Sequence, residues 1–119
     1  MIWVNFAKKY LSAFAAKDLN QLKETYSDSI IFSNSNGVIS GKNQLLLYNE
    51  SIFKEYDMIS ISIQEVAYKN KVIFINYVIT KTKEDISTSR DVVDIIQIDN
   101  TRIKSIKTFY NKWGIIEWQ

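Results

Sequence analysis

The second half of the chain most constrains its fold, because tight turns divide it into long β-type segments. Isoleucine alternates with polar residues over positions 59–63, which is the pattern of a half-buried strand. Turn residues follow at Lys69-Asn70, Glu84-Asp85 and Asn100-Thr101. The chain has no proline, the residue that confines a strand to a sheet edge. We therefore expect four antiparallel strands in chain order, over residues 57–68, 72–83, 87–98 and 103–113.

The first half has the period of amphipathic helices instead. Apolar residues from Trp3 to Phe14 recur on one helical face, and Asp18 is a typical N-cap for a short second helix to about residue 26. A third helix, with Ser40 as its N-cap, is expected over about residues 42–53. Two short strands are expected over residues 30–32 and 38–39, because the turn signal Asn36-Gly37 lies between them. One α+β domain over residues 1–119 accommodates all of these elements.

The composition excludes several kinds of site. The chain has no His and no Cys, which rules out disulfides, thiolate metal sites, cysteine nucleophiles and Ser-His-Asp catalysis. Three glycines leave little room for a phosphate-binding loop, so no cofactor or metal is expected. With 15 basic and 13 acidic residues, the charge indicates neither a nucleic-acid nor a membrane partner. Without a signal peptide or a long apolar stretch, we expect a cytoplasmic protein.

Two residues conflict with their apolar surroundings. Asp94 lies between Val93 and Ile95, where a carboxylate is costly to bury unless it is hydrogen-bonded, paired or protonated. Tyr10 lies within the apolar stripe of the first helix, so its hydroxyl needs a buried partner or a cavity. Residue type alone leaves structural roles open: Tyr10 could bond a backbone carbonyl, and Asp94 could bond nearby backbone or an arginine.

The central strands of the expected sheet are apolar on both faces. Helices from the same chain can cover only one of these faces. A large exposed apolar patch usually marks an interface. We therefore expect a homodimer that packs through the outer sheet face, with residues 113–118 helping to cover its rim.

Five phrases in the chain carry a family resemblance. They are YLSAF at Tyr10–Phe14, Lys17-Asp18-Leu19, the run from Leu22 to Asp28, GVISG at Gly37–Gly41, and the segment from Val92 to Ile103. With the order of elements, they resemble the nuclear transport factor 2-like superfamily, in particular its SnoaL-like and ketosteroid isomerase-like branches. The resemblance implies a cone-like α+β barrel, with three N-terminal helices packed on a strongly curved mixed or antiparallel sheet around an apolar pocket.

The resemblance also implies roles for individual residues. In the isomerase branch, a helix tyrosine and a protonated strand aspartate donate hydrogen bonds to a developing oxyanion, and Tyr10 and Asp94 match these two. Asn34 matches the position of the general base, and an asparagine cannot take up a proton. We expect Tyr10 and Asp94 to form an oxyanion-hole-like pair, with Asn34 at the pocket rim. Three further aromatic residues could line the pocket: Tyr77, Tyr110 and Trp113.

Two classes of function follow. In the first, the pocket holds a small, largely apolar, carbonyl-containing ligand, either for binding or for isomerase-, cyclase- or lyase-like proton transfer without metal or nucleotide. In the second, the protein is a non-enzymatic dimerisation or protein-interaction module. The missing base favours binding over catalysis. A cavity of several hundred Å³ with Tyr10 and Asp94 on its wall would favour the first class, whereas a pocket filled by Phe14, Tyr48, Phe53 or Trp113 would exclude it.

Overall fold

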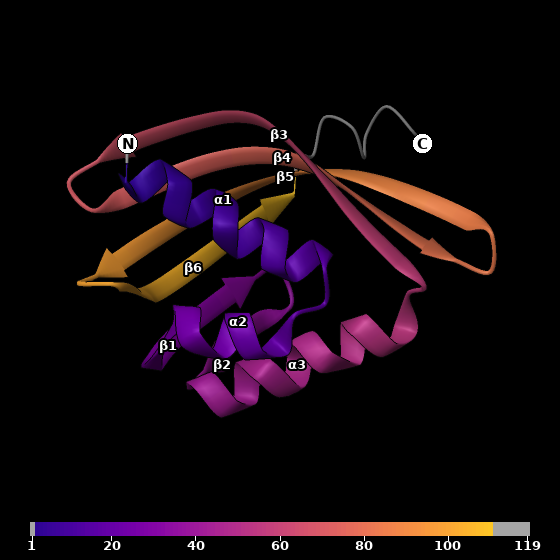
Figure 1. The fold of residues 1–119 in the computed structure, drawn as a ribbon, viewed down its shortest axis with the longest axis horizontal. Helices are drawn as coiled ribbons and strands as arrows, with labels where there is room; N and C mark the ends of the chain where they lie inside the picture. The colour runs from indigo at the N-terminus through magenta and orange to yellow at the C-terminus, as the bar shows by residue number, and fades with distance from the viewer. Residues whose placement is uncertain (1, 111–119) are drawn as a thin grey trace.

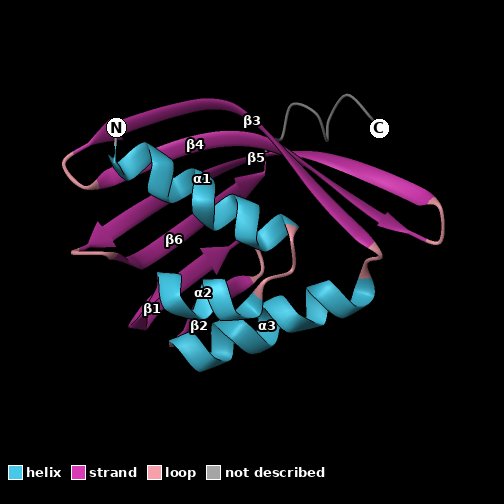
Figure 2. Cartoon of the chain, viewed as in Figure 1, coloured by secondary structure: helices cyan, strands magenta, loops and turns pink. Residues whose placement is uncertain are grey.

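Three helices and six strands make up the structure, a computed structural model that describes residues 2–110 (Figure 1). The elements are α1 (Ile2–Ala15), α2 (Leu19–Thr25), β1 (Tyr26–Asn34), β2 (Gly37–Ser40), α3 (Lys42–Glu55), β3 (Met58–Lys69), β4 (Val72–Lys83), β5 (Ile86–Asp99) and β6 (Arg102–Tyr110). In Figure 2, α1 lies across the front of β4, β5 and β6. The other two helices contact β1, and α3 also contacts β2.

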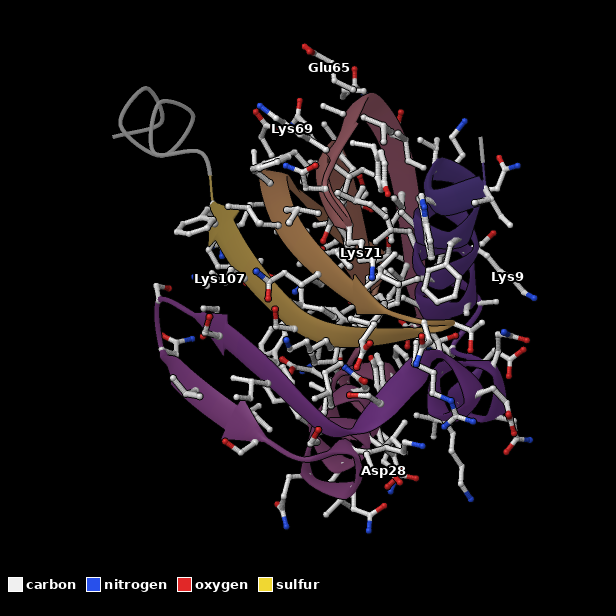
Figure 3. All side chains as sticks on the ribbon, turned by 90° about the vertical axis from the view of Figure 1, so that its left-hand side faces the viewer. Lys9, Asp28, Glu65, Lys69, Lys71 and Lys107 are labelled. Carbon is white, nitrogen blue, oxygen red and sulfur yellow. The ribbon has the colours of Figure 1, made fainter. Side chains whose placement is uncertain are left out.

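All six strands belong to one mixed sheet in the order β2-β1-β6-β5-β4-β3. The four strands from β3 to β6 form the expected antiparallel meander, and β1 lies parallel beside β6. The predicted α+β architecture of helices on a curved sheet is confirmed, but the sheet does not close into a barrel. It stays open because β2, a strand of four residues, pairs only with β1 and leaves β3 as the opposite edge. Figure 3 shows the curvature of the sheet, with α1 along its inner side and Lys107 on the outer side of β6.

The three turns of the β3–β6 meander are tight although none of them contains glycine. Both central residues have positive φ at Asn70 and Lys71 (52° and 64°) and at Glu84 and Asp85 (51° and 65°). Two successive left-handed residues give a turn whose twist matches that of the flanking strands. The turns therefore fall where the sequence predicted them, the first of them one residue later.

The remaining boundaries differ from prediction mainly through tertiary pairing. β1 is longer than residues 30–32, because it pairs with both β2 and β6. Asp18 caps α2 as predicted, since its Oδ1 accepts a hydrogen bond from the backbone N–H of Gln21 at 3.0 Å. Ser40 does not cap α3; Gly41 occupies the cap position without a side-chain bond. A register shift between Ile63 and Glu65 confirms the bulge predicted in β3.

The core lies between the inner face of the sheet and the helices. Alternate residues of β4 and β5 point inward, and on these strands they include Ile73, Ile75 and Ile96, all fully buried. The outer face carries the other residues of these strands, among them Phe74 (43% exposed), together with Phe109 of β6 (52% exposed). The outer apolar face expected from the sequence is therefore present in the described part of the chain.

Candidate functional site

The inner face of the sheet is hollow toward the β4–β5 hairpin. A cavity of about 570 Å³ lies there, lined by residues of α1, α3, β1, β4, β5 and β6. Its volume lies within the usual range for sites that hold small organic molecules. Six of the seven tyrosines of the chain line it: Tyr10, Tyr26, Tyr48, Tyr56, Tyr77 and Tyr110. The cavity is therefore walled by flat apolar rings that carry hydroxyl groups.

Asp94 lies directly behind this wall. It is 1% exposed, its Oδ2 accepts a hydrogen bond from the Tyr77 hydroxyl at 2.9 Å, and its Oδ1 accepts one from the Thr108 hydroxyl at 2.7 Å. The register explains both contacts: Thr108 is directly opposite Asp94 on β6, whereas Tyr77 lies diagonally across on β4. Both donors line the cavity, so the carboxyl group acts on it through them.

Burial governs the acidity of this group. Desolvation raises the pKa of Asp94 to about 6, and the hydrogen bonds from Thr108 and Tyr77 partly oppose that rise. The pKa of Tyr77 is raised well above its usual value, first by burial and then by the charge of Asp94. Tyr77 therefore keeps its proton at neutral pH, and Asp94 changes its charge close to physiological pH.

A second polar group on the wall joins α1, β1 and α3. The Tyr26 hydroxyl donates a hydrogen bond to Oδ1 of Asn49 at 2.7 Å. The ring of Tyr10 lies beside that of Tyr26, with 6.2 Å between centroids. Burial is the main cause of the raised pKa of Tyr10, and electrostatic interactions with Tyr26 and Asp94 raise it further. Both tyrosines are neutral hydroxyl groups at the cavity.

Several of the predicted site residues come together here. Tyr10, Tyr77 and Tyr110 line the cavity, and Asp94 lies behind it. The partner of Asp94 differs from the prediction, because Tyr77 and Thr108 bond its carboxyl group while Tyr10 interacts with Tyr26. Phe14, Tyr48 and Phe53 do not fill the space; Phe14 and Tyr48 are part of its wall.

Asn34 and Trp113 do not join this group. The structure places Asn34 at the β1–β2 turn, outside the cavity lining, where its Oδ1 accepts a hydrogen bond from the backbone N–H of Asn36 at 2.9 Å. Its position on the pocket rim is thus corrected: the amide shapes the turn, a common use of asparagine. Trp113 lies outside the described residues.

Sequence reasoning missed Thr108 and Asn49. Asn49 is 4% exposed and lies one helical turn from both Leu45 and Phe53, which form the buried face of α3. A polar residue at such a position signals a buried hydrogen bond, so this spacing could have identified it. Thr108 gave no comparable signal, because its role depends on which residue of β5 it faces.

Two cations border the cavity on the β4–β5 side. Lys81 Nζ lies 5.1 Å from the ring centroid of Tyr56, and the Arg90 guanidinium carbon lies 4.4 Å from that of Tyr110. All four residues line the cavity. No Asp or Glu of residues 2–110 lines it, so the described wall offers no direct carboxylate base.

The described residues contain no cluster of acidic side chains that could hold a metal ion. None of the helices within residues 2–110 is both long enough and apolar enough to cross a membrane.

Comparisons with solved structures identify the fold. An LEH-like epoxide hydrolase of M. tuberculosis superimposes with a TM-score of 0.86 at 10% identity, over 97% of this chain and 82% of that one. A putative SnoaL-like polyketide cyclase from Shewanella denitrificans gives 0.83 at 12% identity, over 98% and 95%. A Catenulispora acidiphila protein of ketosteroid isomerase-like fold, solved with trimethylamine, gives 0.80 at 11% identity, over 89% and 85%.

These identities are low, so the structural likeness shows the fold alone. No curated protein matches the sequence. The profile of the SnoaL-like domain, in contrast, matches residues 7–106, which cover every helix and strand described above at least in part. The chain therefore belongs to the SnoaL-like domain family, as the phrases in its sequence indicated.

Proposed function

We propose that this protein binds a small, largely apolar molecule through a carbonyl or enol oxygen. The observation that carries the proposal is the cavity of about 570 Å³ whose wall combines tyrosine rings with the Tyr77–Asp94–Thr108 group. Flat rings favour a flat or cyclic ligand, and the buried hydroxyls favour one with a hydrogen-bonding oxygen. The resemblance in fold to putative polyketide cyclases supports a carbonyl-bearing ligand.

Asp94 would control which way the Tyr77 hydroxyl points. While Asp94 is ionised, Tyr77 donates its proton to the carboxylate and can only accept a bond from a ligand. Once Asp94 is protonated, it can donate to the Tyr77 oxygen, and the Tyr77 proton becomes available to a ligand oxygen. Binding of a carbonyl or enolate oxygen is therefore coupled to proton uptake by Asp94. Because the pKa of Asp94 is raised to about 6, this protonation requires little free energy near neutral pH.

Binding is favoured over catalysis. An isomerase- or cyclase-like reaction needs a base beside the reacting carbon. The residue at the matching family position, Asn34, lies at the β1–β2 turn, and no carboxylate of residues 2–110 lines the cavity. The hydroxyl groups of the wall can stabilise a negative oxygen. Lys81, the one amine among the described lining residues, lies four residues along β4 from Tyr77, at the β4–β5 end of the cavity.

Benzophenone and diphenylmethane test the proposal, because they share two rings and differ by the carbonyl group. We expect wild-type protein to bind benzophenone about tenfold more tightly in calorimetric titration, as one buried hydrogen bond would give. Tyr77→Phe should remove most of this preference. Tyr68→Phe is the matched control, since Tyr68 is the one tyrosine outside the cavity lining. Failure of wild-type protein to bind either compound would refute the cavity as a ligand site.

The outer sheet face supports a second role, which we propose as dimerisation. Phe74 and Phe109 are exposed there, and Val93 and Ile95 between them are only half-buried. Contiguous apolar surface of this kind is typical of an interface, and a two-fold dimer is the commonest arrangement. Sedimentation should show a dimer at micromolar concentration, and Phe74→Lys/Phe109→Lys should dissociate it. A wild-type protein that sediments as a monomer would contradict this role.

A further inference from the structure

We propose that the ligand carries an oxyanion, such as a carboxylate, which Lys81 and Arg90 bind at the β4–β5 end of the cavity. This inference rests on the proposed function and specifies its ligand as an apolar organic acid with a second, carbonyl oxygen. One end of the molecule would meet the tyrosine hydroxyls near Asp94, and the acidic end would meet the two cations.

The register places both cations on the inner face of neighbouring strands. Lys81 pairs with Thr88, and Arg90 pairs with Ile79, so the two long side chains are diagonal neighbours that point to the same side. Both line the cavity, with Lys81 half-buried and Arg90 more exposed. Their charges act on each other: burial lowers the pKa of Lys81, and the Arg90 charge lowers it further.

Neither cation has a carboxylate partner within residues 2–110. The two salt bridges there join Lys42 to Asp28 and Lys54 to Glu50. Glu55 acts on Lys81 only at a distance, and its effect is smaller than that of Arg90. Neighbouring like charges with no counter-ion are unfavourable, and an anion between them would relieve the repulsion.

The surrounding side chains favour an anion over a cation. A tyrosine-rich cavity could in principle hold a cationic ligand against its rings. Here the rings of Tyr56 and Tyr110 already face Lys81 and Arg90. This contact holds the cations in place and leaves their N–H groups able to donate to an oxyanion. The hydroxyl of Thr88, which also lines the cavity, offers a further donor.

The spacing of the two polar ends constrains the ligand. Tyr77 and Lys81 are four residues apart on β4, or roughly 13 Å along the strand at the usual rise per residue. Their side chains converge on the cavity, so the distance between the ligand's oxygens is shorter than this. A keto acid with two rings has a suitable length, and p-benzoylbenzoate is a simple probe of that shape.

The test compares p-benzoylbenzoate with its neutral amide by calorimetric titration. Wild-type protein should bind the acid about tenfold more tightly than the amide. In about 0.5 M salt, this ratio of affinities should fall by about fivefold. Lys81→Met/Arg90→Gln should abolish the preference, measured as the ratio of the two affinities in the same variant. The control variant Lys107→Met/Arg102→Gln removes the same amount of charge at residues outside the cavity lining, so it should keep the preference for the acid. The single variants Lys81→Gln and Arg90→Gln should each weaken it, should the double variant fail to fold.

The outcomes separate this inference from the proposed function. If wild-type protein binds benzophenone and the amide but does not prefer the acid, the anion site is refuted and the cavity remains a ligand site. A preference that survives Lys81→Met/Arg90→Gln refutes the anion site equally. If none of the three probes binds, the proposed function fails, and the anion site fails with it.

Discussion

The inner face of the sheet has two ends that share one backbone pattern and differ in what they enclose. At one end, Ile73, Ile96 and Ile106 are fully buried against the helices. At the other end, Tyr77 and Lys81 continue the same alternation along β4, but they border a cavity. Branched aliphatic side chains pack to high density, whereas rings and long cations leave space and turn polar groups toward it.

Asp94 lies at the boundary between the two ends. Ile75, fully buried, faces it on one side, and Thr108, which lines the cavity, faces it on the other. A carboxyl group at this place is enclosed by the core yet bonded to the cavity wall. Alternation along a strand therefore shows which residues point inward, whereas side-chain chemistry decides whether the inside is filled.

The largest expected effect contrasts two isoleucines. Ile96→Ala should reduce the free energy of unfolding by about 2–5 kcal/mol, because it leaves a void in the filled end. Ile79→Ala should cost less, about 1–2 kcal/mol, since Ile79 borders the cavity and its loss only enlarges existing space. Urea denaturation measures both. Equal losses would show that the two ends are packed alike.

The second effect is the dependence of stability on pH. The folded-state pKa of Asp94 is raised from 3.8 to about 6, so its favourable contribution is present below about pH 4 and is lost as the pH rises through about 6. The shift corresponds to about 3 kcal/mol. Asp94→Asn should lack this loss. The difference in unfolding free energy between wild type and Asp94→Asn should therefore change by about that amount between acid and slightly alkaline pH. A constant difference would mean that Asp94 ionises normally.

A third, smaller effect concerns the support of Asp94 by β6. Thr108→Val removes one of its two donors and should destabilise the protein by about 1–2 kcal/mol at slightly alkaline pH, where the carboxylate is charged. The same substitution in an Asp94→Asn background should cost less. A double-mutant cycle built from urea denaturation measures this coupling. A coupling energy near zero would contradict the hydrogen bond.

The smallest effect contrasts two cavity tyrosines. Tyr48 lines the cavity, and its hydroxyl makes no hydrogen bond to residues 2–110, so Tyr48→Phe should change stability by less than about 0.5 kcal/mol. Tyr26→Phe should cost about 1–2 kcal/mol, because it leaves the buried Asn49 oxygen without its donor. Thermal unfolding of the pair measures the difference. A large loss in Tyr48→Phe would indicate that the Tyr48 hydroxyl makes a stabilising contact.

The sequence allowed the elements to be predicted because their signals are local. The period of α1, the Asp18 cap and the two-residue turns each depend on a few neighbouring residues. Asp94 and Tyr10 stood out for the same reason, as polar groups in apolar segments. The resemblance then placed them near one pocket, which the cavity now supports as a site for a ligand.

The contacts between elements could not be predicted in the same way. The bond from Thr108 to Asp94 depends on the β5–β6 register, which shifts between Gln97 and Ile98. A one-residue slip would turn a different set of side chains inward, and the residue types alone do not reveal it. Asn34 illustrates the same limit, because an asparagine in a loop can either line a pocket or shape a turn, and the residue type does not distinguish the two roles.

We expect the tyrosine-lined end of the sheet to bind a carbonyl compound and the isoleucine-filled end to bind none. Titrating benzophenone into protein labelled on tyrosine and isoleucine side chains, and recording NMR spectra, tests it directly. We expect the signals of Tyr10 and Tyr77 to move with ligand concentration, while those of Tyr68 and Ile96 stay in place. Movement of Tyr68 and Ile96 without Tyr10 and Tyr77 would contradict the account.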